Sequence, residues 1–113
     1  MLIFPLKKEW YEKIRSGEKT IEYREVKPYW KKRIHNELLA NVVFPEDMKQ
    51  VVLLDNGISI DFVMLDCKLR LGYTNRNMTA SITKIEIVDG KDTDLAIDKP
   101  MYAIHLADVR EEE

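Results

Sequence analysis

The sequence has few of the residues that mark several classes of protein. Its 113 residues include one cysteine, two histidines, four glycines and four prolines. One cysteine can form neither an internal disulfide nor a zinc site built from several thiolates. No apolar run approaches the roughly 18 residues that span a bilayer, and the opening Met1–Leu6 stretch is too short for a secretory signal. We therefore expect a cytoplasmic protein that uses no metal, no cofactor and no membrane.

Charged residues are abundant and unevenly distributed along the chain. They make up 34% of the residues, apolar residues make up 45%, and the net charge is −2. Residues 1–35 carry a net charge of +5 and residues 36–113 a net charge of −7. A basic first third can present a local positive field to an anion, although the same charges also suit solvated helices. The length and apolar content predict a single folded domain over residues 1–113.

The first third of the chain predicts a strand followed by a helix. Leu2–Phe4 is a short apolar run that Pro5 ends. Three apolar residues spaced by four share one helix face: Leu6, Trp10 and Ile14. Gly17 stands where helices commonly end in a left-handed residue. Pro28 predicts a second short helix over residues 29–34, because proline suits a first helical turn. Trp30 and Ile34 are its expected buried residues.

The rest of the chain is irregular over residues 36–48 and then rich in β patterns. Asn56-Gly57 between two apolar runs predicts a hairpin, since both turn positions need a positive φ. Further strand patterns follow at 67–71, 82–87 and 101–106, with a turn at 74–77. A bulge near Thr83-Lys84 would restore the alternation. Roughly six strands and two early helices predict an α+β fold, a small mixed barrel or curled sheet with the helices on one side. The residues from about 109 to 113, which end in three glutamates, predict a disordered acidic tail.

One segment combines residues that suit ligand chemistry. Gly17–Arg24, with the sequence GEKTIEYR, has the form G-x-K-x-x-E-x-R. Lys19 lies in the turn before the strand, from which an ammonium can reach a cleft. Glu22 and Arg24 are two positions apart on a strand and therefore share a face. A guanidinium suits phosphate or a base edge, and a carboxylate can orient it or accept a hydrogen bond from an amino group. The same spacing also fits a surface salt bridge of little energetic weight.

This segment and the Trp10–Ser16 stretch before it resemble the signature of ASCH domains, which belong to the PUA-like superfold. Residues 29–33 and 71–73 also resemble segments of the small bacterial and phage-type members. The resemblance implies a small mixed PUA-like β-barrel, in which two short helices near the N-terminus flank a cleft. It also implies RNA or a nucleoside as the ligand.

On this resemblance, Lys19, Glu22 and Arg24 line the cleft. One branch of the family is similar to amidohydrolases that remove the acetyl group from N4-acetylcytidine. That branch has a lysine at the position of Lys19 and a threonine nucleophile at the position of Glu22. A carboxylate cannot replace a hydroxyl nucleophile, and Thr20 is not at the matching position, so the sequence departs from this branch. Other relatives are linked to ribonuclease activity.

Basic and aromatic residues outside the motif extend the candidate site. Cations beside aromatic rings suit single-stranded RNA, whose phosphates need positive charge and whose bases stack. The candidates on the second helix are Tyr29, Lys31, Lys32 and Arg33, and those for the opposite wall of the cleft are Arg70, Tyr73 and Arg76. Each of them also fits a solvated surface. Neither His35 nor His105 has a partner at metal-ligand spacing, and Cys67 reads as a small buried apolar residue.

These patterns lead to one expected function and two alternatives. We expect an RNA- or nucleotide-binding module with a basic cleft built on the G-x-K-x-x-E-x-R segment. The first alternative is an enzyme acting on RNA or on a modified pyrimidine nucleoside, with Lys19 and Glu22 as its catalytic groups. The second alternative is a regulatory protein-interaction domain. The sequence leaves the ligand, any catalysis and the oligomeric state open.

Overall fold

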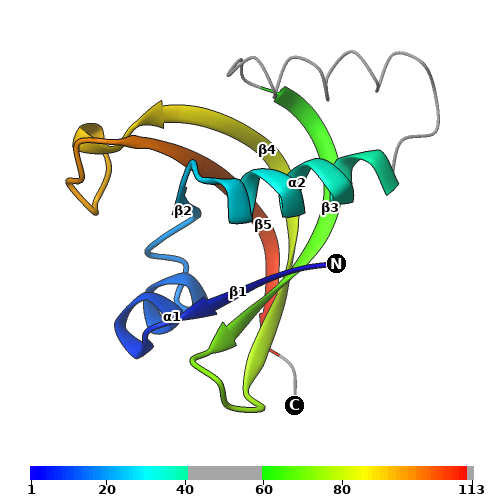
Figure 1. Cartoon of the computed structure of the whole chain (residues 1–113). Helices are drawn as coiled ribbons and strands as arrows, with labels where there is room; N and C mark the ends of the chain where they lie inside the picture. Colours follow the sequence, from blue (N-terminus) through cyan, green and yellow to red (C-terminus); the bar gives the residue numbers. More distant parts are fainter. Residues whose placement is uncertain (41–59, 112–113) are drawn as a thin grey trace.

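The computed structural model describes residues 1–40 and 60–111 (Figure 1). In chain order the elements are β1 (Leu2–Leu6), α1 (Lys8–Arg15), β2 (Ile21–Glu25), α2 (Pro28–Ala40), β3 (Ile60–Leu71), β4 (Asn77–Asp89), the 3₁₀ helix η1 (Gly90–Asp92) and β5 (Pro100–Glu111). Neither helix in this part of the chain is long and apolar enough to cross a membrane.

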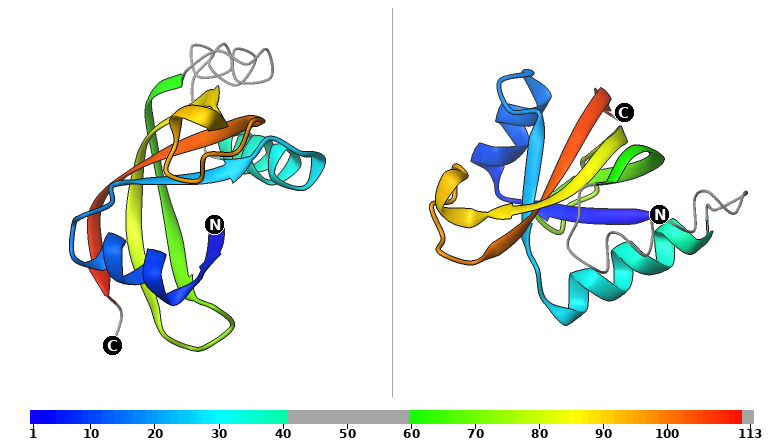
Figure 2. Two further views of the ribbon diagram at one scale, coloured as in Figure 1. Left: turned by 90° about the vertical axis from the view of Figure 1, so that its left-hand side faces the viewer. Right: turned by 90° about the horizontal axis from the view of Figure 1, so that it is seen from above.

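The five strands form one mixed sheet in the order β1-β3-β4-β5-β2. β1 runs parallel to β3, and the other neighbouring strands are antiparallel. The long strands β3, β4 and β5 bend, so the sheet curls into a half-barrel (Figures 1 and 2). The predicted α+β fold, with two early helices and a curled mixed sheet, is confirmed. The hairpin predicted at Asn56-Gly57 lies outside the described residues.

The edge strands β1 and β2 border the open side of the half-barrel, which we call the seam. β1 continues through Pro5 to Leu6, whereas the sequence predicts an end at Pro5. An edge strand tolerates proline, because a position on its free side needs no backbone N–H. Helix α2 starts next to the seam, and its Trp30 stacks on Phe4 of β1 with ring centroids 5.1 Å apart. The seam is therefore partly closed by aromatic packing.

Helix α1 packs on the sheet through a different face from the predicted one. Its buried residues are Tyr11 and Ile14, whereas Trp10 is only half-buried and Leu6 belongs to β1. The helix begins at Lys8, so Leu6 joins the core from β1, and Tyr11 joins Ile14 on the buried face of the helix. Gly17 adopts a φ of +85°, which confirms the predicted left-handed turn after the helix.

Helix α2 begins at Pro28 as predicted and buries Trp30 and Ile34. It continues to Ala40, so residues 36–40 are helical where the sequence analysis expected irregular structure. Glutamate, leucine and alanine, which fill most of this extension, are strong helix formers.

The core consists of alternate residues of the strands, as the period of two predicts. The bulge predicted near Thr83-Lys84 is confirmed by a shift in the pairing of β4 with β5 between Ile82 and Lys84. The core members from the strands are Leu2, Phe4, Leu6, Leu65, Cys67, Leu69, Met78, Ala80, Ile82, Ile85, Tyr102, Ile104 and Leu106. β5 continues to Glu111, so residues 109–111 belong to the sheet instead of the solvated tail expected there.

Candidate functional site

A hollow of about 350 Å³ opens at the seam. Four parts of the chain that are distant in sequence build it: the end of β1 with α1, the strand β2, the start of α2, and the segment between η1 and β5. The lining residues with polar or aromatic side chains are Lys7, Trp10, Glu22, Tyr23, Arg24, Glu25, Lys27 and Trp30; Leu95, Ile97 and Met101 supply apolar surface. We call this cavity the seam hollow.

Glu22 and Arg24 form an ion pair in the wall of the seam hollow. Nη2 of Arg24 lies 3.0 Å from Oε2 of Glu22. Their side chains are only 19% and 7% exposed, respectively, so this is not the solvated surface pair that the spacing also allowed. Both side chains leave β2 on one face, as expected for residues two apart on a strand. A buried ion pair contributes little net stability, but the loss of one partner is costly.

The same two side chains satisfy polar backbone groups of both edge strands. Nη2 of Arg24 donates to the carbonyl oxygen of Pro5, 2.6 Å away across the seam. Oε1 of Glu22 accepts a hydrogen bond of 3.0 Å from the backbone N–H of Tyr23. The guanidinium also packs on the rings of Phe4 and Trp30, at 5.3 and 5.2 Å from their centroids. Unpaired strand edges can pair with strands of other molecules. Here the ion pair binds one backbone group on each edge strand.

Arg24 keeps hydrogen-bonding capacity for a ligand. Both of its hydrogen bonds to described residues come from Nη2, so the N–H groups on Nε and Nη1 have no partner in that part of the chain. Neither nitrogen is a fully buried atom without a partner. These donors are therefore open to solvent at the seam hollow.

Lys19 does not line the seam hollow, although the sequence analysis grouped it with Glu22 and Arg24. Its Nζ lies 2.6 Å from Oδ2 of Asp94 and 4.9 Å from the ring centroids of both Trp10 and Tyr23. Trp10 and Tyr23 both line the hollow, but the Lys19 side chain is not among its lining groups. The structure thus brings together the Glu22 carboxylate and the Arg24 guanidinium, and it pairs the Lys19 ammonium with Asp94.

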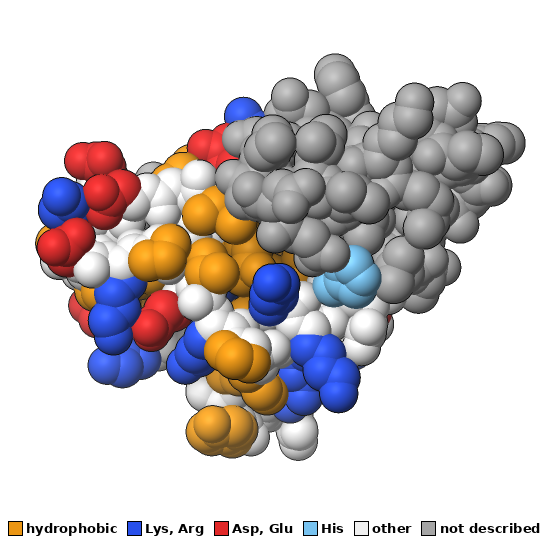
Figure 3. All heavy atoms as spheres, turned by 45° about the horizontal axis from the view of Figure 1, so that its top comes forward, with side chains coloured by type: hydrophobic (Ala, Val, Ile, Leu, Met, Phe, Trp, Pro, Cys, Tyr) orange, Lys and Arg blue, Asp and Glu red, His pale blue; other side chains and the backbone are white. Residues whose placement is uncertain are grey.

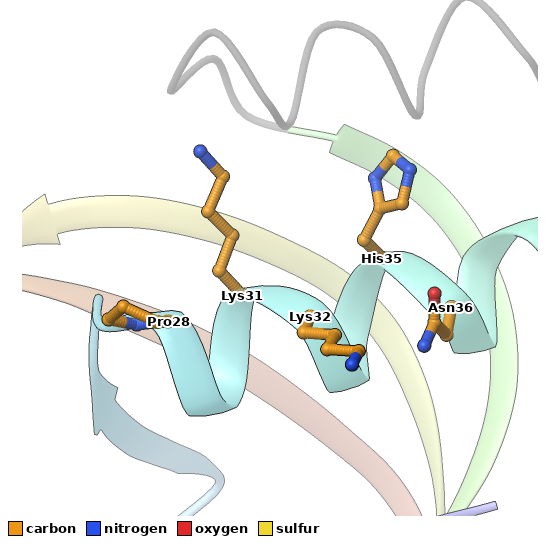
Figure 4. Close-up of a pocket in the computed structure, with 5 residues that line it drawn as sticks. All are labelled: Pro28, Lys31, Lys32, His35 and Asn36. Carbon is orange, nitrogen blue, oxygen red and sulfur yellow. The ribbon is translucent and has the colours of Figure 1, made fainter.

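The predicted residues of α2 form an exposed basic surface beside the seam hollow. Tyr29 is 54% exposed, and the guanidinium of Arg33 lies 4.4 Å from its ring centroid. Lys31 and Lys32 line a second hollow, of about 520 Å³, together with Pro28, His35 and Asn36. In Figure 4, Lys31 and His35 project from one side of the helix, and Lys32 and Asn36 from another. The described lining of this hollow comes from one helix, whereas four parts of the chain define the seam hollow.

The predicted opposite wall is not built by Arg70, Tyr73 and Arg76. All three lie at or near the β3–β4 turn, none of them lines the seam hollow, and Tyr73 is 93% exposed. Arg76 instead pairs with Glu111 at 3.0 Å. Leu95 and Ile97, which no sequence pattern singled out, line the hollow instead. Two apolar residues within a run rich in aspartate are the pattern that could have indicated them.

Burial controls the ionisable groups next to the site. Burial, with added effects of the Asp66 and Glu22 carboxylates, raises the pKa of the Cys67 thiol to about 12, so this thiol is a poor nucleophile at neutral pH. Burial and the nearby carboxylates of Asp94 and Glu86 raise the pKa of Tyr23. Within the described ranges, no group of three or more His, Cys, Asp and Glu side chains is arranged to hold a metal ion.

Comparisons of the chain with protein-family models, with curated proteins and with solved structures find no match. Membership of the ASCH family therefore stays a prediction from the sequence motif.

Proposed function

We propose that the protein is an RNA- or nucleotide-binding module of the PUA-like kind, and that the seam hollow accepts a nucleobase. The observation that carries this proposal is the buried Glu22–Arg24 pair in a hollow that two indole rings also line. A nucleobase offers flat faces for stacking and edges that carry hydrogen-bond donors and acceptors. The volume of about 350 Å³ falls within the usual range for small-molecule sites.

The polar groups of the hollow complement the edge of a base. The Nε and Nη1 donors of Arg24 suit a carbonyl oxygen or ring nitrogen, because a guanidinium presents its N–H groups in a planar fork. The carboxylate of Glu22 has lone pairs beyond its two protein hydrogen bonds and can accept from an exocyclic amino group. The indoles of Trp10 and Trp30, which both line the hollow, provide surfaces on which a base can stack.

Cations around the hollow supply sites for phosphate. Lys7 and Lys27 line the hollow and are exposed. Lys31, Lys32 and Arg33 follow on α2, all exposed, and none of them has an ion-pair partner among the residues that the structure describes. On the face shown in Figure 3, Lys and Arg side chains lie next to a group of hydrophobic ones, with Asp and Glu side chains also at its border. Unpaired cations beside apolar and aromatic surface are typical of sites for single-stranded nucleic acid.

No observation in the structure favours the enzymatic alternative. It needs Lys19 and Glu22 within one cleft, but the Lys19 ammonium is paired with Asp94 and lies outside the seam hollow. The protein-interaction alternative likewise has no contact or surface that supports it over nucleotide binding.

Binding measurements test the proposal directly. The full chain is titrated with AMP, GMP, CMP, UMP and a short single-stranded RNA, and tryptophan fluorescence is the readout because two indoles line the hollow. We expect at least one nucleotide and the RNA to bind, and the RNA affinity to fall with salt by a slope of about −0.7 per phosphate contact. Lys27→Gln should weaken RNA binding and reduce this slope, whereas Lys68→Gln on β3, which does not line the hollow, should change neither. Absence of binding by every nucleotide and by RNA at low salt would contradict the proposal.

A further inference from the structure

Lys19 is a charged side chain that the fold buries outside the seam hollow. Its side chain is 7% exposed, and its Nζ lies 2.6 Å from Oδ2 of Asp94. The rings of Trp10 and Tyr23 contact the ammonium, and the backbone N–H of Lys19 donates to the carbonyl of Lys13 at 3.0 Å. A buried ammonium is unfavourable without a partner of opposite charge. The turn between α1 and β2 therefore strongly favours one position for Asp94.

Asp94 belongs to the segment 93–99, which connects η1 to β5 and supplies Leu95 and Ile97 to the seam hollow. The backbone hydrogen bonds of this segment stay within it or go to Gly90 of η1, such as that from the N–H of Ile97 to the carbonyl of Gly90 at 3.1 Å. Three ion pairs join it to other described residues. One holds the buried ammonium of Lys19 against Asp94, whereas the pairs of Lys99 with Glu25 at 3.4 Å and of Lys91 with Asp98 at 3.8 Å are exposed.

The shape of the segment 93–99 also depends on contacts that hold it in place. Ala96 has a φ of +50°, in the left-handed region that is unfavourable for residues with a Cβ. Gly90 lies so close beneath the segment that a Cβ there would be 2.1 Å from the carbonyl oxygen of Ile97. A segment with a strained residue, whose backbone hydrogen bonds reach no further than Gly90, needs an anchor on a more distant part of the chain to keep a single position.

We propose that Lys19 is a positioning residue for the seam hollow. Through Asp94 it holds the segment 93–99 so that Leu95 and Ile97 line the seam hollow, and it does not touch the ligand itself. The positioning follows from the contacts of the protein alone, whereas its effect on nucleotide binding rests on the proposed function. In this role the lysine of the motif sets the width of the site and takes no part in base recognition.

Amide hydrogen exchange, followed by NMR on the unliganded protein, tests the positioning. Lys19→Met should accelerate exchange at the Leu95 and Ile97 amides by about tenfold or more relative to the core amides of Ile82 and Ile104. Lys99→Met, which removes the exposed pair with Glu25, is the matched control. It should change the exchange rates of the Leu95 and Ile97 amides by less than about twofold.

Lys19→Met/Asp94→Asn provides a second test, because it also removes the charge of Asp94, which is 40% exposed, and so leaves neither charge without a partner. It should give the same local acceleration. Unchanged exchange in these variants, or a rise that is equal in the loop and in the core, would overturn the inference.

Nucleotide binding then separates the two proposals. For a nucleoside monophosphate that binds the wild-type protein, Lys19→Met should weaken the affinity about tenfold, mainly through faster dissociation. Lys19→Arg keeps the positive charge and should restore part of the loss. If exchange accelerates at Leu95 and Ile97 while the wild-type protein binds no nucleotide, the positioning role stands and the proposed function fails. Normal nucleotide dissociation from Lys19→Met despite faster exchange would overturn the role of Lys19 in ligand binding.

Discussion

Two arginine–glutamate pairs in this protein have the same separation but different surroundings. Arg24–Glu22 at the seam and Arg76–Glu111 at the other end of the sheet both have an N–O distance of 3.0 Å. The side chains of the first pair are 19% and 7% exposed, and those of the second are 46% and 34% exposed. Distance alone therefore says little about what an ion pair does.

The difference lies in what surrounds each pair and in what depends on it. Arg24 donates across the seam to Pro5 and packs on Phe4 and Trp30, so the buried pair holds the two sheet edges and faces a cavity. Arg76 and Glu111 connect the β3–β4 turn to the end of β5 in contact with water, where ion pairs are screened and weak. The buried pair is accordingly the one with consequences for both stability and ligand binding.

The largest effect is expected from Arg24→Met. This change leaves the Glu22 carboxylate buried without its cation and the Pro5 carbonyl without its donor. Breaking a buried pair in this way typically costs about 3–5 kcal/mol. Urea unfolding followed by circular dichroism should show a lower midpoint with an unchanged m-value. A loss in free energy of unfolding below about 1 kcal/mol, the range of exposed pairs, would mean that the buried pair contributes no more to stability than the exposed one.

The double variant Glu22→Leu/Arg24→Met separates the contribution of the buried pair to stability from its contribution to binding. Apolar residues of similar volume often replace a buried pair with neutral or positive effect on stability. We expect the double variant to regain most of the free energy of unfolding that Arg24→Met loses. Nucleotide binding, measured by fluorescence titration, should be lost in both variants. Recovery of stability together with wild-type affinity would show that the pair closes the seam without recognising a ligand.

Tyr11→Phe tests the surroundings of the exposed Arg76–Glu111 pair, because the buried Tyr11 also contacts Glu111. The Tyr11 hydroxyl donates to Glu111 at 2.9 Å, and losing this hydrogen bond should cost about 0.5–1.5 kcal/mol. Burial, with the hydrogen bond to Glu111, raises the pKa of Tyr11 to about 12. The folded state thus favours the neutral phenol. This contribution is fully present below the unfolded pKa of about 10 and is lost as the pH rises to about 12.

Thermal unfolding over this pH range checks the sign of the effect. The melting temperature of the wild-type protein should fall more steeply between about pH 10 and pH 12 than that of Tyr11→Phe, which lacks this ionisation. Parallel curves for the two proteins would mean that Tyr11 does not contribute to the alkaline loss of stability.

The smallest effect is expected from Arg76→Gln, the counterpart of the change at Arg24. Water can solvate both Glu111 and the new amide, so the urea midpoint should stay within the error of the wild-type value. The pKa of Glu111, which the Tyr11 hydroxyl and Arg76 lower, should rise in this variant but stay below its ordinary value. NMR titration of the Glu111 carboxyl measures this shift, and a rise in pKa above the ordinary value would contradict it.

Much of the local structure could be predicted from the sequence because it depends on neighbours along the chain. The alternation of a strand places Glu22 and Arg24 on one face, and their 3.0 Å contact confirms it. The start of α2 at Pro28, the turn at Gly17 and the bulge in β4 follow from the same kind of short-range rule. The face of α1 was misjudged, because the residue that begins the helix decides which positions form its apolar stripe.

The partners of these residues were beyond prediction, because they depend on how the sheet curls. Lys19 pairs with Asp94, which lies 75 positions further along the chain, and Leu95 and Ile97 line the hollow in place of the residues expected from the β3–β4 turn. The elements and the shared face of Glu22 and Arg24 follow from the order of residues along the chain, because spacing on a strand is a local property. The burial of this face at the seam and the pairing of Lys19 with Asp94 follow from the closure of the half-barrel, which long-range packing sets.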